Sequence, residues 1–225
     1  MPVIPTTEDH PTRARILETA RRLFHEQGFH ATGISTILRE ADVNSGSLYH
    51  YFPSKEALLT GVLGLYVRLL RPAVMDPVEG MNGDPIGRVF ALLGYYRQGL
   101  QMTDFKMGCP VGNLALEVGD DNAAARGLID LNFNNWSAVV EGWLAAAGDR
   151  LPVSTDRRGL AGFVLTVMEG AMMRARAAQS FTPFDESVNQ LRAYFDQLET
   201  AARNEAAGGG GIGNTVPSGG SHVAS

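Results

Sequence analysis

The chain has 225 residues, of which 44% are hydrophobic, and this is enough to fill the core of one large domain or of two smaller ones. Its formal net charge of −5 at pH 7 excludes binding to nucleic acid through a general excess of positive charge, so a DNA-binding surface would have to separate its charges by face. Cys109 is the only cysteine, which excludes a disulfide framework within the chain and a zinc site made of cysteines.

Apolar side chains recur at helical spacing near the start of the chain. They predict a first helix over residues 12–27, with Thr12 as its N-cap. A second apolar stripe predicts a helix from Ile34 to Ala41, with Thr32 as its cap. These two helices have the length and spacing of elements that pack on each other in a small helical domain.

A third helix is expected from Asn44, which would cap it, to about His50. It is very short and carries small polar and aromatic side chains, and Ser54 would cap a fourth helix directly after it. A bracing helix followed through a tight connection by a short helix with a polar face is typical of helix-turn-helix DNA readers. The start of the fourth helix, with Lys55 and the Tyr49 hydroxyl beside it, also suits a phosphate group.

The rest of the chain is expected to be helical as well, because it lacks the alternating apolar pattern of a β-strand. The fourth helix is expected to end at about Leu70, before Pro72, and a loop is expected from Asp76 to Pro85. Five further helices are expected over residues 86–102, 112–119, 122–147, 156–180 and 185–204.

The patterns together predict an all-α protein of about nine helices. A three-helix DNA-binding head would occupy residues 12–53, and a helical bundle for ligand binding and dimerisation would occupy residues 54–206. Residues 1–11 and 207–225 are expected to be disordered, since the glycine-rich tail has little apolar surface to offset the entropy of ordering it.

The sequence favours a cytoplasmic protein with no membrane partner. The start of the chain lacks the apolar run after a basic segment that a secretory signal has. The most apolar helix, near residues 160–173, contains Glu169 and is too short and too charged to span a bilayer.

The segment from Phe29 to Lys55, with SLYHYFPSKEAL at its end, resembles the DNA-binding head of the tetracycline-repressor-like (TetR) family. The match extends from Arg13 to Leu58, and its YHYFPSKEAL block is highly specific. The resemblance implies an all-α homodimer that binds double-stranded DNA at a palindromic operator, usually as a repressor, and is released by a small molecule. No cofactor is predicted. By the same match, the residues that face DNA would be Ser35, Asn44, Ser45, Gly46, Ser47, Tyr49, His50 and Lys55.

The chain departs from the family pattern at two positions of the head. Gly33 stands where the family usually has serine or threonine, so a phosphate-binding hydroxyl is lost. Ser45 stands where lysine or arginine is frequent, so a positive charge is lost. These two losses imply a modest affinity for the operator.

A second informative segment surrounds Cys109, where Gly108 and Pro110 interrupt the helical pattern. Asn113 and Glu117 follow at a spacing of four residues and could face one cavity together. The segment resembles a TetR subgroup with Gly-Cys-x-x-Gly-Asn-Leu at this place, and some members of that subgroup respond to small electrophiles. Two interpretations stay open, a buried cysteine that fills space and a reactive thiol, and the first is the more common.

Aromatic, methionine and polar residues of the bundle are the candidates for an effector pocket, because flexible and aromatic side chains suit apolar ligands. The candidate ligand-binding residues are Tyr95, Tyr96, Met102, Phe105, Cys109, Asn113, Glu117, Phe133, Trp136, Met168 and Met172.

The last two helices carry the candidate dimer interface. Their apolar residues repeat at spacings of three and four, which is typical of helices that pack in a four-helix interface. The candidate interface residues are Leu160, Phe163, Val164, Val167, Val188, Leu191, Phe195 and Leu198.

Two other classes of function compete with a DNA-binding regulator. One is a small helical enzyme with Cys109 as nucleophile, which is disfavoured because no histidine lies between His50 and His222 to act as its base. The other is a helical adaptor that binds only a protein. No catalytic residues and no metal site are predicted, since no two histidines stand four residues apart around a carboxylate.

Overall fold

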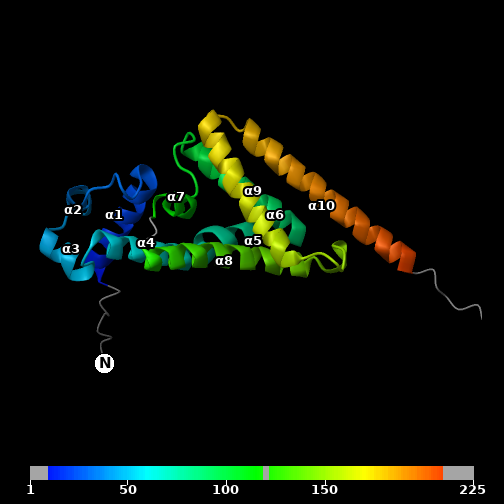
Figure 1. Cartoon of the computed structure of the whole chain (residues 1–225), viewed down its shortest axis with the longest axis horizontal. Coiled ribbons are helices and arrows are strands. Elements are labelled where there is room, and N and C mark those ends of the chain that lie inside the picture. Colours follow the sequence, from blue (N-terminus) through cyan, green and yellow to red (C-terminus); the bar gives the residue numbers. More distant parts are fainter. Residues whose placement is uncertain (1–9, 119–121, 210–225) are drawn as a thin grey trace, which may run out of the picture.

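The computed structural model describes residues 10–118 and 122–209, and this part of the chain is helical without a strand. Because α4, η2 and α5 follow one another without a break, the described residues form nine separate helices, as the sequence predicts (Figure 1). The elements are α1 (Pro11–Gln27), α2 (Ile34–Ala41), α3 (Ser45–Tyr51), α4 (Lys55–Leu69), η2 (Leu70–Met75), α5 (Asp76–Met81), α6 (Pro85–Met102), α7 (Pro110–Glu117), α8 (Ala123–Ala146), η3 (Gly148–Arg150), α9 (Arg157–Ala178) and α10 (Thr182–Gly209).

The helices α1, α2 and α3 form a small head at one end of the molecule (Figure 1). Ile16, Leu23, Ile37 and Leu48 are fully buried there, so each of the three helices contributes to one core. The expected caps of the first two helices are wrong. The ring of His10, not Thr12, accepts the first backbone N–H of α1.

Thr32 does not cap α2, because its hydroxyl bonds to the preceding turn. Gly33 occupies the N-cap position without a side-chain hydrogen bond, whereas Thr32 is buried and its hydroxyl donates to the carbonyl oxygens of Gly28 and Leu23. The threonine therefore closes the α1–α2 turn instead of capping a helix. Asn44 and Ser54 do cap α3 and α4, as predicted.

Helix α4 does not end before Pro72, and this corrects the predicted boundary. A π-helical turn, η2, carries the chain past Pro72 into α5, so that the loop between α5 and α6 is limited to residues 82–84. Proline has no N–H and its ring displaces the carbonyl four residues earlier, and a wider π turn accommodates both. The result is one helix of 27 residues from Lys55 to Met81.

This long helix is also the described stretch that is apolar enough to cross a bilayer by length and composition, with a mean hydropathy of 1.4 over its best window. The most apolar helix is therefore not the one near residues 160–173, as the sequence suggested. Core helices of soluble proteins pass the same test, and Leu58, Leu59 and Leu63 of this helix are fully buried within the chain.

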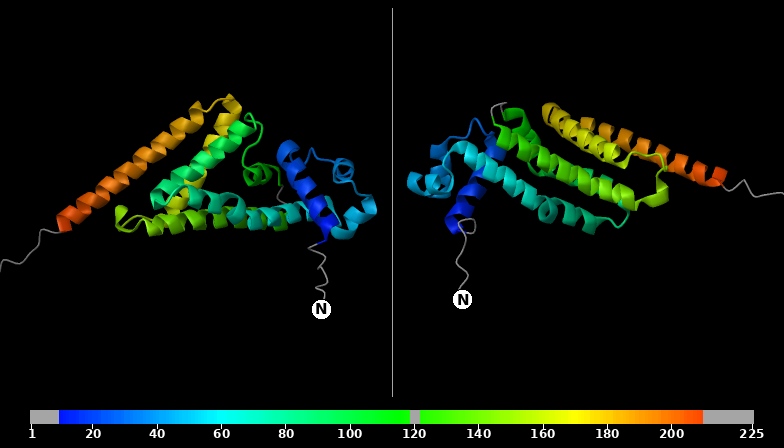
Figure 2. Two further views of the ribbon diagram at one scale, coloured as in Figure 1. Left: turned by 180° about the vertical axis from the view of Figure 1, so that it is seen from behind. Right: turned by 60° about the horizontal axis from the view of Figure 1, so that its bottom comes forward.

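The body is built of long helices that lie side by side. In the right-hand view of Figure 2, α4 with α5, then α8, then α9 and α10 follow one another across the molecule, and the contacts between these helices agree with that order. Helix α6 packs against α5, α8 and α9, and the short α7 lies between the head and the body. Helix α10 continues to Gly209, past the expected end at 204 and the expected disorder from 207, while residues 1–9 and 210–225 lie outside the described part.

Candidate functional site

Helix α3 has one buried face and one exposed face. Leu48 is fully buried and Phe52, directly after the helix, is 3% exposed, and these two side chains anchor α3 to the head. The side chain of Asn44 accepts a hydrogen bond from the backbone N–H of Ser47, 2.8 Å, which fixes the start of the helix. Tyr49 remains 48% exposed on the opposite face.

The residues predicted to face DNA lie at the surface of the head. Five of them lie on α3, on either side of the buried Leu48, and Asn44 caps that helix. Ser35 lies on α2 and Lys55 begins α4. Six of them are exposed and two, Ser47 and Lys55, are half-buried. The Lys55 ammonium lies 4.5 Å from the centre of the Phe29 ring and donates to the carbonyl oxygen of His30 at 3.5 Å. Lys55 therefore also holds the head together, and partial burial lowers the pKa of its ammonium group.

Several arginines of the head have partners inside the head. Arg15 donates to the carbonyl oxygen of Ala41 at 2.7 Å, Arg21 forms two hydrogen bonds with Glu18, and Arg22 forms ion pairs with Glu26 and Glu40. The charges of Arg21 and Arg22 are compensated by these carboxylates, whereas Arg15 binds a backbone carbonyl oxygen. Helix α3 itself contains no lysine, arginine or acidic residue, so its face is mostly neutral, as the serine at position 45 suggests.

The head meets the body at α7. The ring N–H of His25 on α1 donates to the carbonyl oxygen of Gly108 at 2.8 Å. The backbone N–H of His30 donates to the Glu117 carboxylate at 2.9 Å, and the His30 ring donates to the Glu117 carbonyl oxygen at 2.8 Å. Gly28 lies against the same carboxylate, so that a Cβ atom on it would be 2.8 Å from a Glu117 oxygen.

A cavity of about 310 Å³ lies in the body beside this junction. Its wall comes from six helices and from the π turn, and α1 of the head is one of them. Of the residues predicted to bind ligand, those that line this cavity are Tyr95, Tyr96, Cys109, Phe133, Trp136, Met168 and Met172.

Four residues predicted to bind ligand do not line this cavity, because each is either exposed or engaged elsewhere. Met102 is 79% exposed at the end of α6, and Phe105 packs on the Phe181 ring, with the ring centres 4.6 Å apart. The side chain of Asn113 accepts a hydrogen bond from Arg176 at 3.0 Å, and Glu117 binds the head. The expected convergence of Asn113 and Glu117 on one cavity is wrong, because Asn113 is bound by Arg176 of α9 and Glu117 by His30 of the α1–α2 turn.

Cys109 occupies the N-cap position of α7, where its sulfur accepts the backbone N–H of Gly112 at 3.4 Å. It is buried, and burial raises the pKa of its thiol well above the ordinary value, with a further contribution from the negative charge of Glu169. A nucleophilic cysteine needs a lowered pKa. The geometry favours the interpretation of Cys109 as a wall of the cavity rather than as a reactive thiol.

Polar groups that the sequence pattern did not predict also line the cavity. The Oε1 atom of Glu169 and the hydroxyl of Tyr66 are buried there without a hydrogen-bond partner in the described part of the chain. Burial raises the pKa of the Glu169 carboxyl group. An acidic residue within the apolar stripe of α9 was a visible signal, but the stripe was interpreted only as an interface. Arg21 and His25 also line the cavity and were assigned only to the head.

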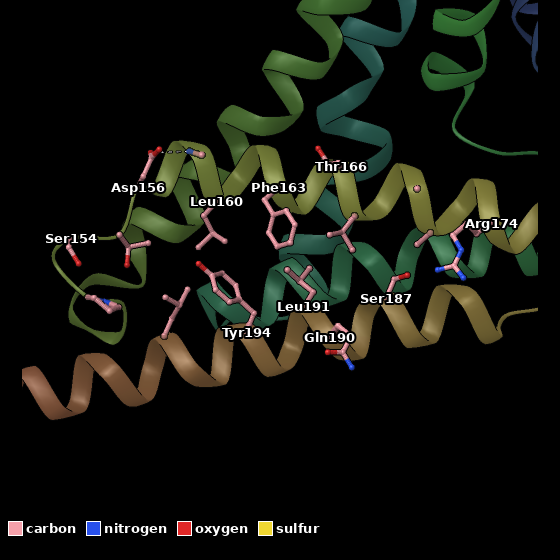
Figure 3. Close-up of a pocket in the computed structure, with 17 residues that line it drawn as sticks. Ser154, Asp156, Leu160, Phe163, Thr166, Arg174, Ser187, Gln190, Leu191 and Tyr194 are labelled. Carbon is pink, nitrogen blue, oxygen red and sulfur yellow. Dashed lines mark hydrogen bonds between the residues drawn. The ribbon is translucent and has the colours of Figure 1, made fainter.

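An open groove of about 980 Å³ runs along α9 and α10 on another face of the body. Figure 3 shows Leu160 and Phe163 of α9 opposite Leu191 and Tyr194 of α10. The groove also contains Val167 and Leu198, and Val188 is half-buried beside it.

Two of the predicted interface residues, Val164 and Phe195, do not belong to this surface. Val164 is fully buried within the chain. Phe195 is 1% exposed and packs on the Phe90 ring, with the ring centres 5.5 Å apart. Val164 of α9 and Phe195 of α10 both pack within one chain. The sequence pattern alone does not distinguish such packing from an interface between two chains.

Among the described residues, no three histidine, cysteine or acidic side chains come close enough to hold a metal ion. The described part of the molecule therefore offers two kinds of candidate site, the exposed face of α3 and the cavity in the body.

Comparisons with known proteins identify both parts of the chain. The family model "Bacterial regulatory proteins, tetR family" matches residues 16–62, and "Transcriptional regulator LmrA/YxaF-like, C-terminal domain" matches residues 85–190. An HTH-type transcriptional regulator of Mycobacterium tuberculosis is 32% identical over 186 residues, which are 80% of this chain and 92% of that protein. The HTH-type transcriptional regulator LmrA of Bacillus subtilis is 30% identical over 174 residues, 76% of this chain and 90% of that protein.

Solved structures agree with this result. The reduced form of NemR from Escherichia coli is 26% identical and covers 82% of this chain and 96% of its own, with a TM-score of 0.70. A TetR transcriptional regulator from Chloroflexus aurantiacus is 25% identical and covers 83% of this chain and 94% of its own, with a TM-score of 0.72. The all-α architecture that the sequence predicts is therefore confirmed.

Proposed function

Because the chain belongs to the TetR family of bacterial transcriptional regulators, we propose that it is a homodimeric repressor that a small molecule in the body cavity releases from a palindromic operator. One observation carries the ligand-responsive part. The wall of the cavity includes Arg21 and His25, which belong to α1 of the DNA-binding head. A molecule in the cavity would therefore touch the head directly.

DNA binding is assigned to the exposed face of α3 with its neighbours Ser35 and Lys55. The small side chains Ser45 and Gly46 allow the start of α3 to approach base edges closely, and the Tyr49 hydroxyl suits a phosphate. Since this face is mostly neutral, each subunit would make few phosphate contacts, and two subunits would be needed for useful affinity.

The groove along α9 and α10 is the proposed dimer interface. Phe163 is 47% exposed and Tyr194 43% exposed, and their rings pack on each other with centres 6.1 Å apart. A second copy of the chain would cover both. A dimer would place its two α3 helices in major grooves one helical turn apart, about 34 Å.

The release mechanism follows from the contacts between head and body. A ligand that binds one body conformation better than the other shifts the equilibrium by its differential affinity. The hydrogen bonds from His25 to Gly108 and from His30 to Glu117 would transmit that shift, because they connect α1 and the α1–α2 turn to both ends of α7.

An enzyme with Cys109 as nucleophile is the weaker alternative. The cavity lined by Cys109 is also lined by a histidine, His25. This histidine comes from the head, whereas the sequence excludes a histidine only from the body. The ring N–H of His25 is bound to Gly108, however, and the raised pKa of the buried thiol opposes nucleophilic attack. We accordingly propose a regulator without catalytic activity that acts in the cytoplasm, where the DNA is.

The DNA-binding assignment is tested by anisotropy of a labelled DNA fragment from upstream of the protein's own gene. Ser45→Glu adds a negative charge to the exposed face of α3 and should abolish the complex by repulsion from the phosphates. Gln98→Glu adds the same charge to an exposed site on α6 and should leave binding unchanged. Binding by Ser45→Glu at the affinity of the wild type would remove α3 from the interface.

The dimer assignment is tested by light scattering. Phe163→Glu places a charge in the groove and should give monomers, whereas Leu131→Glu, at a similarly exposed site on α8, should not. A dimeric Phe163→Glu variant would place the interface elsewhere. Phe195 is unsuitable for this test because its substitution would disturb the core of each chain.

A further inference from the structure

The charged groups around the body cavity differ in their partners. Arg21 donates two hydrogen bonds to Glu18, at 2.8 and 2.5 Å, and the His25 ring donates to the Gly108 carbonyl oxygen. The Oε1 atom of Glu169 has no hydrogen-bond partner within the described chain. The Tyr66 hydroxyl has no hydrogen bond of good geometry there either, but the positive charge of Arg21 acts on it. The basic groups at the cavity are thus satisfied, while one oxygen of its acid still lacks a donor.

The position of Glu169 is shaped by its surroundings. A Cβ atom at Gly112 would overlap the Glu169 carboxylate, so the absence of a side chain there leaves room for it. The Cys109 thiol lies on the same side, and Leu165 and Met168 of α9 line the cavity beside it. A buried acceptor without a partner is unfavourable in the empty protein, and a ligand that supplies a donor removes this cost.

The rest of the wall is aromatic. The hydroxyl groups of two of its tyrosines are already engaged, since Tyr96 accepts the indole N–H of Trp136 at 3.2 Å and Tyr95 donates to the Ala73 carbonyl oxygen at 2.7 Å. Their rings, with that of Phe133, remain as apolar surface around the cavity. Aromatic faces attract cations, and do so more strongly where water is excluded.

We propose that the effector is a lipophilic cation, an apolar molecule with one protonated amine whose N–H groups bind the Glu169 carboxylate and whose apolar part lies among the aromatic rings. The inference rests on the proposed function, because it names the ligand class of the same cavity. An ammonium group has three donors and no acceptor. A volume of about 310 Å³ accommodates one or two rings with a short chain.

A cation fits better than the two other head groups that an apolar molecule commonly carries. A neutral hydroxyl can donate to Glu169 but leaves the buried negative charge uncompensated. A carboxylate would be repelled by Glu169, and the arginine that lines the cavity, Arg21, is already bound to Glu18. Only the ammonium group supplies both the donor and the opposite charge.

The test uses one scaffold with three head groups, 4-phenylbutylamine, 4-phenylbutan-1-ol and 4-phenylbutanoate, titrated calorimetrically into the full-length protein without DNA. The amine should bind roughly tenfold more tightly than the alcohol, or better, and the carboxylate should bind most weakly. Equal or tighter binding of the alcohol or the carboxylate would overturn the proposal, and so would the failure of all three probes to bind.

Substitutions then assign the preference to a residue. Glu169→Gln keeps the shape of the side chain and should reduce the preference for amine over alcohol to within about threefold, without weakening the alcohol. Glu186→Gln, on the exposed side of α10, is the matched control and should retain the preference. A preference that survives in Glu169→Gln would contradict the assignment, and the wild-type ranking of the three probes stands even if this variant does not fold.

Operator release is measured separately, which distinguishes the two proposals. If the amine binds through Glu169 but leaves the DNA complex intact, the ligand class stands and the coupling to DNA is wrong. If the alcohol or the carboxylate releases DNA and the amine does not, the regulator stands and the lipophilic cation is wrong.

Discussion

The polar groups of the head and those of the body cavity differ in whether they have hydrogen-bond partners. In the head, the groups that hold the fold have partners, including the Arg21 pair with Glu18, the Asn44 cap and the Thr32 hydroxyl. In the cavity, Glu169 and Tyr66 keep buried atoms without hydrogen-bond partners in the described chain. Hydrogen bonds within the head therefore hold α3 in one geometry. In the cavity, by contrast, a buried polar group without a partner is unfavourable, and a bound molecule that supplies a donor would remove this cost.

The largest loss of stability is expected when the buried side chain that anchors α3 is removed. Leu48→Ala deletes a fully buried side chain in a small core and should destabilise the head by about 2–5 kcal/mol. DNA binding should be lost with it. The measurement is thermal unfolding followed by circular dichroism.

The matched control for this substitution is Leu131→Ala, at a site on α8 that is 42% exposed and should change stability little. A Leu48→Ala variant that unfolds at the temperature of the wild type would mean that α3 is held by contacts other than its core residues.

The junction between head and body should be the next most sensitive place. Gly28 has φ +88° and ψ 160°, a backbone region that residues with a side chain avoid, and Gly28→Ala should cost about 1–3 kcal/mol from this strain. The new Cβ would also press on the Glu117 carboxylate. The free energy of unfolding in urea measures the total.

A double-mutant cycle divides that total. Adding Glu117→Ala to Gly28→Ala removes the steric overlap but not the backbone strain, so that the double variant should cost less than the sum of the two single ones. Strict additivity would show that the Glu117 side chain moves away without cost and does not hold the head firmly.

The sequence predicts the head well because its signals are local. The Asn44 and Ser54 caps and the left-handed Asp42, with φ 50°, each depend on residues within one turn. The failures there are also instructive. A threonine before a helix can bond backwards into the preceding turn, as Thr32 does, and the pattern of residue types does not reveal which direction its hydroxyl takes.

The cavity is less predictable because its wall comes from helices distant in sequence. Periodicity identifies the aromatic and methionine residues, but it does not separate Tyr96, which lines the cavity, from Phe105, which packs on Phe181. The pattern of α1 predicts only a helix of the DNA-binding head, and it does not indicate that His25 of this helix lines the cavity. The same limit applies to α10, where Phe195 faces its own chain and Tyr194, one residue earlier, does not.

The buried state of Glu169 gives a prediction about how the free energy of unfolding depends on pH. Its pKa in the folded protein is raised above the ordinary 4.5 by burial, so the folded state retains a proton that the unfolded chain has already released. The contribution of Glu169 to the stability of the wild type should therefore fall as pH rises from about 4.5 through the raised pKa. Glu169→Gln lacks this loss, so the two proteins should be nearly equal at low pH and should diverge above it.

His25 does not disturb this comparison. Burial lowers its pKa, so its own contribution is lost as pH falls below 6.5, and it is the same in both proteins and cancels in the difference. The measurement is urea unfolding of both proteins from pH 4 to pH 8. A difference that does not change with pH would show that Glu169 has a partner in solution.

The smallest effect on stability is expected at the exposed face of α3, where a substitution should act on DNA affinity instead. Tyr49 is 48% exposed and lies on the face opposite Leu48, so Tyr49→Ala should change the free energy of unfolding by less than about 0.5 kcal/mol. Its affinity for the operator should nevertheless fall, together with about one unit of the salt dependence, if its hydroxyl binds a phosphate. Met102→Ala, at a 79% exposed site on the body, should leave both quantities unchanged. These outcomes would separate stability from affinity within the head, with buried residues that fix the geometry and exposed residues that act on DNA. A Tyr49→Ala variant with reduced stability and unreduced affinity would reverse that division and show that the tyrosine belongs to the fold.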